Sequence, residues 1–173
     1  MPTFIVSGTP GTGKSTVCKA LLQHYDTGIH LPVDDFREFV VSGMAHPVPE
    51  WTPETSRQFL LARQAVGKVA MLYHLVGFAV AIDDVLGPGD EKAFDLHLAP
   101  HKILLRADLE VVLERNRQRS NKHFDTRILE GVITDLHAIQ DVEAHLLHGW
   151  HVIDTTHLTV FETVMAIRAA TQA

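Results

Sequence analysis

The chain has 173 residues, of which 46% are hydrophobic and 21% charged, and its formal net charge at pH 7 is −6. This length is typical of one domain with a core of its own, and the composition is that of a soluble globular protein. The acidic balance argues against a broad nucleic-acid surface, and no apolar run approaches the roughly 18 residues of a membrane span.

The first predicted element is a buried strand over residues 3–7, because Thr3-Phe4-Ile5-Val6 is an apolar run. Residues 8–15, Gly-Thr-Pro-Gly-Thr-Gly-Lys-Ser, follow it directly and match the phosphate-binding pattern G-x-x-x-x-G-K-[ST] in full. Because a strand is expected at this position, we expect no signal peptide. Cys18 is the single cysteine, so disulfides are excluded and we expect a core-facing thiol in a cytoplasmic protein.

The octet indicates a nucleotide site because its glycines let successive backbone N–H groups cradle phosphates. Lys14 reaches the β and γ phosphates, the Ser15 hydroxyl holds Mg²⁺, and a helix over 14–25 points its positive end at the same anion. The alternative is a glycine-rich turn with an incidental lysine. The expected nucleotide-binding residues are Gly8, Thr9, Pro10, Gly11, Thr12, Gly13, Lys14, Ser15 and Thr16.

Strand-like and helix-like patterns then alternate along the chain. Short apolar runs predict strands at 29–33, 78–82, 102–105 and 150–153. Helices are predicted at 36–42, from Thr52 to Gly77, from Asp108 to Arg115, as one element over 129–146, and after the Thr159–Glu162 capping box. The long helix from Thr52 has one apolar face, made by residues 59, 62, 66, 69, 73 and 76. This order predicts a single α/β domain over 1–173, a three-layer αβα P-loop fold with a five-stranded parallel sheet.

Two acidic pairs follow predicted strands, Asp34-Asp35 after the second strand and Asp83-Asp84 after the third. In a parallel sheet, ligands bind outside the carboxyl ends of the strands. The phosphate-binding segment of residues 8–15, called the phosphate loop below, also lies there. A carboxylate there can deprotonate an attacking hydroxyl or help Ser15 to hold Mg²⁺. The alternative for each aspartate is a helix N-cap.

A basic segment over about 115–127 contains five of the fifteen lysines and arginines: Arg115, Arg117, Arg119, Lys122 and Arg127. Arginines from a moving segment stabilise the charge that spreads over a phosphoryl group during transfer, so we expect a lid. The alternative is a solvated basic helix end. The twelve histidines are scattered without metal-ligand spacing, and a zinc site is not expected.

With these motifs the chain resembles a small P-loop kinase of the nucleoside-monophosphate-kinase-like group. Asp34-Asp35-Phe36-Arg37 resembles the D-D-Y-R segment of 5′-polynucleotide kinase domains, which implies Asp34 as general base and Arg37 as a contact to the reacting phosphate region. Residues 115–119, Arg-Asn-Arg-Gln-Arg, resemble the R-N-x-x-R lid of those domains, and Asp84 matches their third-strand aspartate. That resemblance implies Arg115 and Arg119 as lid arginines.

A second branch is also similar, the chloramphenicol phosphotransferase-like kinases. Ala81-Ile82-Asp83-Asp84-Val85 resembles their V-D-D-V strand ending, and residues 152–156 with the capped helix that follows resemble this group and gluconate- and shikimate-type kinases. Both branches imply Lys14, Ser15, Asp34 and an arginine lid. ATP as the phosphoryl donor is likewise implied by the resemblance.

The two branches differ in the acceptor. Residues 33–58 contain two arginines against five acidic residues, which does not suit a long anionic substrate. We therefore favour a small hydroxyl compound such as an antibiotic, nucleoside or sugar over a polynucleotide 5′ end. Trp51 either stacks on this substrate or pins its own loop. Arg57 and Arg63 are six residues apart on different helical faces and are not expected to clamp a phosphate.

The predicted mechanism is in-line transfer. Mg²⁺ is held by Ser15 with Asp83 or Asp84, Asp34 deprotonates the acceptor hydroxyl, and Arg115 and Arg119 close over the phosphoryl group. A different class stays open, a nucleotide-binding switch or ATPase that phosphorylates nothing. We expect no membrane partner, and the chain is either a monomer or a homodimer.

Overall fold

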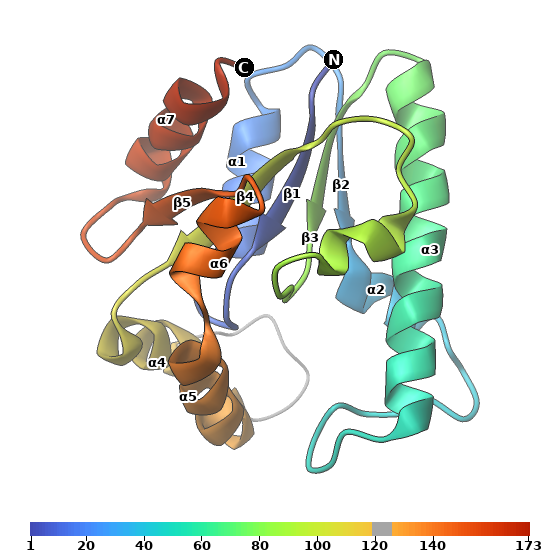
Figure 1. The fold of residues 1–173 in the computed structure, drawn as a ribbon, viewed down its shortest axis with the longest axis vertical. Helices are drawn as coiled ribbons and strands as arrows, with labels where there is room; N and C mark the ends of the chain where they lie inside the picture. Colours follow the sequence, from blue (N-terminus) through green and yellow to red (C-terminus); the bar gives the residue numbers. More distant parts are fainter. Residues whose placement is uncertain (119–125) are drawn as a thin grey trace.

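The computed structural model describes residues 1–118 and 126–173, and within them five parallel strands form one sheet (Figure 1). The order across the sheet is β2-β3-β1-β4-β5, so the first strand lies at the centre. The strands are β1 (Thr3–Ser7), β2 (Gly28–Pro32), β3 (Ala79–Asp83), β4 (His101–Arg106) and β5 (His151–Asp154).

The connection from β3 to β4 contains a 3₁₀ turn, whereas α-helices form the other three connections and follow β5. The helices are α1 (Lys14–Leu22), α2 (Val33–Glu38), α3 (Pro53–Leu75), α4 (Leu109–Arg117), α5 (Glu130–Ile139), α6 (Val142–Leu147) and α7 (Val160–Thr171). Two short 3₁₀ turns, η1 (Asp90–Phe94) and η2 (Thr126–Leu129), complete the order. Two predicted caps are present, since Thr52 and Thr159 each accept a hydrogen bond from the third residue of their helix, whereas Asp108, the predicted cap of α4, makes no side-chain cap hydrogen bond.

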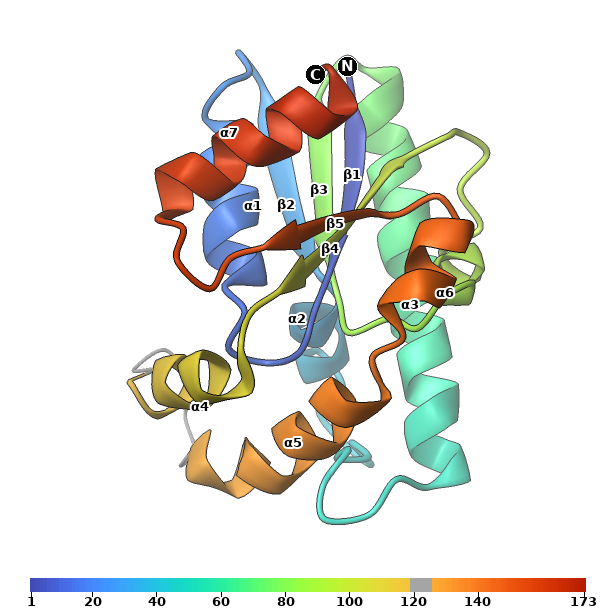
Figure 2. The same cartoon turned by 60° about the vertical axis from the view of Figure 1, so that its left-hand side comes forward.

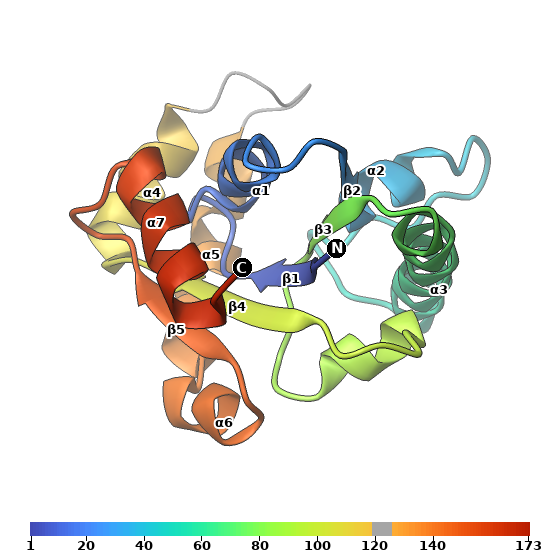
Figure 3. The same ribbon diagram turned by 90° about the horizontal axis from the view of Figure 1, so that it is seen from above.

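The sheet separates two apolar cores, which gives the three predicted layers. On one face Phe4 and Val6 of β1 pack with Cys18 of α1 and Ile167 of α7. On the other face Ile5 of β1 packs against α3, η1 and the indole of a buried tryptophan, Trp150. Figure 3 shows this division, with α1 and α7 on one side of the sheet and α3 and α6 on the other.

Besides shifts at the ends of other elements, such as the first helix, which ends at Leu22 rather than Tyr25, three predicted elements differ from the observed ones. The short helix begins at Val33 rather than 36, because Asp34 and Asp35 occupy its first turn, where acidic side chains suit the helix dipole. The single helix over 129–146 is two helices, α5 and α6, because Gln140 leaves the helical conformation and the Asp141 carboxylate caps the new helix at Ala144 N.

The third difference is on α3, whose apolar face is buried only from Phe59 to Ala70, while Tyr73 and Val76 are exposed. The helix has 23 residues and is about 35 Å long, whereas a five-residue strand spans about 17 Å. The helix is therefore longer than the sheet: its first turns extend beyond the edge where the strands end (Figure 1), and its last turn lies at the opposite edge, where His74 Nδ1 is 3.2 Å from Thr3 Oγ1.

All strands end at the same edge of the sheet, where the phosphate loop, α2 and α4 lie (Figure 1). Figure 2 shows α4 and α5 side by side below this edge, joined by a small apolar cluster around Val112 and Ile133. Both termini lie at the opposite edge. In the described part of the chain, no helix combines the length and apolarity needed to cross a membrane.

Candidate active site

The phosphate loop has a conformation that requires glycine at two close approaches. Gly8 and Gly11 have φ angles of 150° and 96°. A Cβ on Gly8 would lie 2.4 Å from the Leu105 carbonyl oxygen, and one on Gly11 would lie 2.5 Å from that of Val112. Gly13 is the N-cap of α1 and has no side chain to bond the first-turn N–H groups, which are the donors that a phosphate would use.

Lys14 extends along this loop. Its Nζ donates to the carbonyl oxygens of Gly8 at 2.8 Å and Thr9 at 3.2 Å. The ammonium group is therefore held over the curve of the loop, where a cation stabilises bound phosphates.

Ser15 and Asp83 bring a hydroxyl and a carboxylate together at the ends of α1 and β3. Ser15 Oγ donates to Asp83 Oδ2 at 2.5 Å, while His30 Nε2 lies 3.3 Å from Asp83 Oδ1. Burial by itself would raise the pKa of the Asp83 carboxyl, but His30, Ser15 and the charge of Lys14 outweigh it and lower that pKa. Asp83 is therefore held as an anion beside the loop.

Asp84 has a different neighbour. Its Oδ2 accepts from Arg63 Nε at 2.6 Å, and its Oδ1 accepts from the backbone N–H of Val85 at 2.7 Å. Burial raises the pKa of Asp84 although Arg63 lies against it, and the charge of Asp34 adds to the rise. Of the two aspartates, Asp83 is the one that contacts Ser15, and the metal role of Asp84 remains a prediction.

Asp34 lies in the first turn of α2, with its side chain 57% exposed and Oδ1 3.7 Å from Arg37 Nη1. Arg37 is itself buried, because its guanidinium stacks 3.8 Å from the Phe59 ring centroid and donates to the Ala45 carbonyl at 2.8 Å. Arg37 thus joins α2, the following loop and α3 behind the exposed carboxylate of Asp34.

Trp51 also packs against Phe59, the ring on which Arg37 stacks. Its ring stacks on Phe59 with centroids 4.7 Å apart, and its Nε1 donates to Ser56 Oγ at 2.6 Å. These contacts pin the loop before α3, which supports one of the two predicted roles, while 53% of the residue stays exposed.

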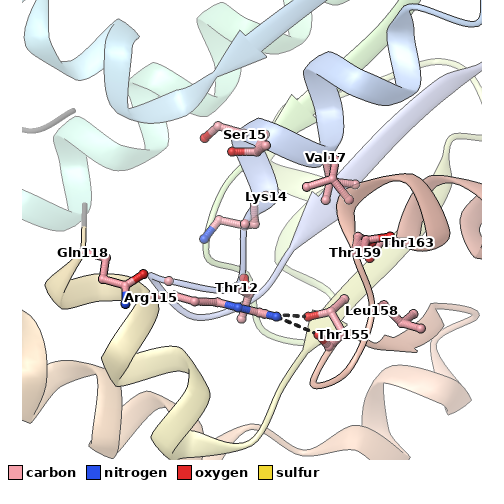
Figure 4. A pocket seen from close by; sticks show the side chains of 14 residues that line it. Thr12, Lys14, Ser15, Val17, Arg115, Gln118, Thr155, Leu158, Thr159 and Thr163 are labelled. Carbon is pink, nitrogen blue, oxygen red and sulfur yellow. Dashed lines mark hydrogen bonds between the residues drawn. The ribbon is translucent and has the colours of Figure 1, made fainter. Parts of the chain in front are cut away.

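A cavity of about 500 Å³ lies beside the phosphate loop, between α1, the end of α4 and the segment after β5. Arg115 spans its wall, donating to Thr155 Oγ1 at 3.3 Å and to the Thr155 carbonyl at 2.9 Å (Figure 4). Lys14 and Ser15 lie on the α1 side of the same cavity (Figure 4).

Two arginines of the basic segment have hydrogen-bond partners within the described residues. Arg115 donates to the Thr155 carbonyl, and Arg117 Nε donates to Glu130 Oε1 of α5 at 2.8 Å. Asn116 Nδ2 donates to the Thr126 carbonyl and Thr126 Oγ1 donates to the Asn116 carbonyl, both at 2.8 Å, so the two flanks of the segment are joined. The predicted lid residues Arg119 and Lys122 and the side chain of Arg127 lie outside what the structure describes.

Comparison with known proteins decides the family. The family model for chloramphenicol phosphotransferase-like proteins matches residues 3–172. The chain belongs to this family. Of the two branches that the sequence resembles, the match is to the second. No curated protein matches the sequence significantly.

Solved structures share the fold of this chloramphenicol phosphotransferase-like chain at low sequence identity. The tunicamycin resistance protein of Deinococcus radiodurans has a TM-score of 0.65 and 18% identity, with 98% of this chain and 95% of that chain covered. A gluconokinase from Sinorhizobium meliloti 1021 has a TM-score of 0.65 and 17% identity, covering 97% and 90%. A shikimate kinase from Bacteroides thetaiotaomicron has a TM-score of 0.63 and 13% identity, covering 99% of each chain. The predicted P-loop kinase fold is confirmed.

Two residues at the candidate active site, Arg63 and His30, are not predicted from the sequence as site residues. The sequence predicts no phosphate clamp from Arg63, which shares no helical face with Arg57, yet Arg63 borders the buried face of α3 at Phe59 and Ala62 and pairs with Asp84. His30 is one of twelve histidines without metal-ligand spacing, but it stands in a short strand whose neighbouring side chains are apolar. A polar residue inside such a strand was the available signal.

Proposed function

We propose that the protein transfers the γ-phosphoryl group of ATP to a hydroxyl of a small molecule, with Mg²⁺ as the metal. The observation that carries this proposal is that the phosphate loop, the Ser15–Asp83 contact and the exposed carboxylate of Asp34 gather at one edge of the sheet. Membership in a phosphotransferase family supports it.

The residues at this edge of the sheet fit both Mg²⁺ and ATP. The Ser15 hydroxyl and the Asp83 carboxylate are hard oxygen donors of the kind that Mg²⁺ prefers. The loop needs glycine at residues 8 and 11, because a Cβ there would clash with the carbonyl oxygens of Leu105 and Val112, and the adjoining cavity of about 500 Å³ is in the size range of small-ligand sites. When bound, ATP supplies the phosphoryl group and Mg²⁺ reduces the charge repulsion on its phosphates.

On the donor side, Lys14 and the first-turn N–H groups of α1 hold the phosphates, and Ser15 with Asp83 holds the metal. Arg115 lines the cavity and keeps α4 against the segment after β5. We propose that Arg115 and Arg119 supply positive charge near the transferred group.

On the acceptor side, Asp34 receives the proton of the attacking hydroxyl on its carboxylate. Arg37 lies 3.7 Å from that carboxylate and, being fixed on Phe59, limits how far Asp34 can turn. We propose that Arg37, Trp51 and Asp84 border the acceptor, with Asp84 held in place by Arg63.

The acceptor is proposed to be small rather than a polynucleotide. Arg37, which lies 3.7 Å from Asp34, binds Ala45 and Phe59, and Arg63 of α3 binds Asp84, so both arginines already have partners. Strong binding of a nucleic-acid backbone needs several cations directed at phosphates, and the net charge of −6 opposes it.

A transfer screen with γ-labelled ATP tests the proposal. The acceptors are phenicol and aminoglycoside antibiotics, nucleosides, sugars and 5′-hydroxyl oligonucleotides, each incubated with and without Mg²⁺. We expect Mg²⁺-dependent labelling of one class of small hydroxyl compound. Labelling of oligonucleotides would replace the small acceptor with a nucleic-acid end. Slow ATP hydrolysis that no alcohol accelerates would contradict a kinase and support a nucleotide switch.

A further inference from the structure

His30 and Asp83 belong to neighbouring parallel strands and share one face of the sheet. In the β2–β3 register His30 lies opposite Ala81, and Pro32 lies opposite Asp83. Because side chains alternate along a strand, residues 30 and 32 of β2 point to the same side as residues 81 and 83 of β3. This is the side of the sheet on which α1 packs, so the His30 imidazole lies beside Asp83 between the sheet and α1.

The two oxygens of Asp83 have separate partners. Oδ2 accepts from Ser15 Oγ at 2.5 Å, and Oδ1 lies 3.3 Å from His30 Nε2, an ion-pair distance at which the ring N–H is not aligned as a hydrogen bond. The contact is shielded from water, since the side chains of His30 and Asp83 are 10% and 5% exposed. Cys18 is the third group here, with its sulfur within 4.8 Å of the same atoms. Burial raises the pKa of the Cys18 thiol, so it stays neutral and does not compete as a charge partner.

A carboxylate rotates readily about its last torsion, because that torsion has broad minima. A partner on one oxygen fixes the rotation and so fixes where the other oxygen points. In metal sites, groups that hold a ligand in place from behind change metal affinity by about tenfold or more when removed.

We propose that His30 is a positioning residue: by holding Asp83 Oδ1 it directs Asp83 Oδ2 at Ser15, and so sets the affinity of the site for Mg²⁺ with nucleotide. This inference rests on the proposed function, in which Ser15 and Asp83 hold the metal. His30 touches neither substrate nor metal in this role.

Nucleotide binding, measured apart from turnover, tests it. The affinity for a non-hydrolysable ATP analogue is measured by calorimetry with Mg²⁺ and with EDTA, and the ratio of the two affinities is the readout. We expect His30→Ala to lower this ratio about tenfold while the affinity in EDTA changes by less than about twofold. The matched control is His74→Ala, which removes a histidine bonded to Thr3 at the start of β1, 3.2 Å from its hydroxyl, and should leave the ratio unchanged.

Two further variants separate positioning from packing. His30→Gln keeps a nitrogen donor of similar reach and should restore most of the ratio, whereas His30→Leu fills the space without a donor and should behave like His30→Ala. Restoration by leucine would overturn the inference, because it would show that only volume matters. In an Asp83→Asn background, His30→Ala should have no further effect on the ratio, and an additive loss would also overturn it.

The outcome for the wild-type protein distinguishes the two proposals. If Mg²⁺ strengthens analogue binding in the wild type and equally in His30→Ala, the role of His30 is wrong and the proposed function stands. If Mg²⁺ has no effect on the wild type, the proposed metal site fails and the role of His30 fails with it.

Discussion

Asp83 and Asp84 are adjacent in sequence, but their surroundings shift the pKa values of their carboxyl groups in opposite directions. Asp83 contacts Ser15 and His30, and its pKa is lowered, whereas burial raises the pKa of Asp84 beside Arg63. The sequence pattern places both residues at the end of β3 but does not say which one faces the loop. That choice depends on the pleat of the strand and on Arg63, which is 21 residues earlier in the chain.

The buried pair of Arg63 and Asp84 should be important for stability. Their side chains are 16% and 4% exposed, and Arg63→Ala would leave a buried carboxylate without its cation. We expect the free energy of unfolding to fall by about 3 kcal/mol, measured by urea denaturation. The control on the same helix is Lys68→Ala, which breaks an exposed pair with Asp95 and should cost less than about 1 kcal/mol. Equal losses would show that the Arg63 pair is not a buried one in solution.

Cys18 should be unreactive in the folded protein. It is buried, and this burial raises the pKa of its thiol, so little thiolate forms near pH 8. Iodoacetamide should therefore modify Cys18 only after the chain unfolds, as followed by the mass of the intact protein. Rapid modification of the native protein would contradict the packing of α1 against the sheet.

At the scale of elements, the sequence predicts the strands better than the helices that surround the site. The central strands β1 and β3 are short runs that are buried at every residue, so both are visible locally. The break between α5 and α6 is not visible in the apolar pattern, because it depends on a backbone turn at Gln140 and a cap at Asp141. The exposure of Tyr73 and Val76 depends on where the sheet ends beside α3, which the periodicity of one helix does not contain.

The contact between α3 and η1 gives a test at this scale. A Cβ on Gly67 would lie 1.8 Å from the carbonyl oxygen of Phe94, so Gly67→Ala must push the two elements apart. We expect a loss of about 1–3 kcal/mol in the free energy of unfolding. Gly131→Ala, on α5 with no atom within 4 Å of the added carbon, is the control and should stabilise the protein by up to about 1 kcal/mol. A neutral Gly67→Ala would mean that α3 and η1 are not in close contact.

At the scale of the whole molecule, the parallel sheet brings residues far apart in sequence to one edge. The site draws on three strands: Ser15 comes after β1, Asp34 comes after β2, and Asp83 is the last residue of β3. That these residues lie together is predictable, because parallel strands end at the same edge of a sheet. The strand order is not predictable in this way, and it is the pairing of β2 with β3 that places His30 beside Asp83.

Nucleotide binding should stabilise the fold as a whole, because the ligand binds only the folded loop. At a concentration 100 times its dissociation constant, an ATP analogue with Mg²⁺ should add about 2.7 kcal/mol to the free energy of unfolding. Lys14→Ala should remove most of this gain under the same conditions, because Lys14 lies over the phosphate loop. An equal gain in both proteins, measured by thermal unfolding, would place the nucleotide elsewhere.

The central claim is that Asp34 activates an acceptor beside a nucleotide held by the phosphate loop. It is tested most directly by measuring transfer from labelled ATP, together with analogue affinity, in Asp34→Asn and in the control Asp35→Asn, the adjacent exposed aspartate of the same helical turn. We predict that Asp34→Asn lowers transfer at least about 100-fold with analogue affinity within about twofold of wild type, while Asp35→Asn keeps both. Near-normal transfer by Asp34→Asn would contradict the account.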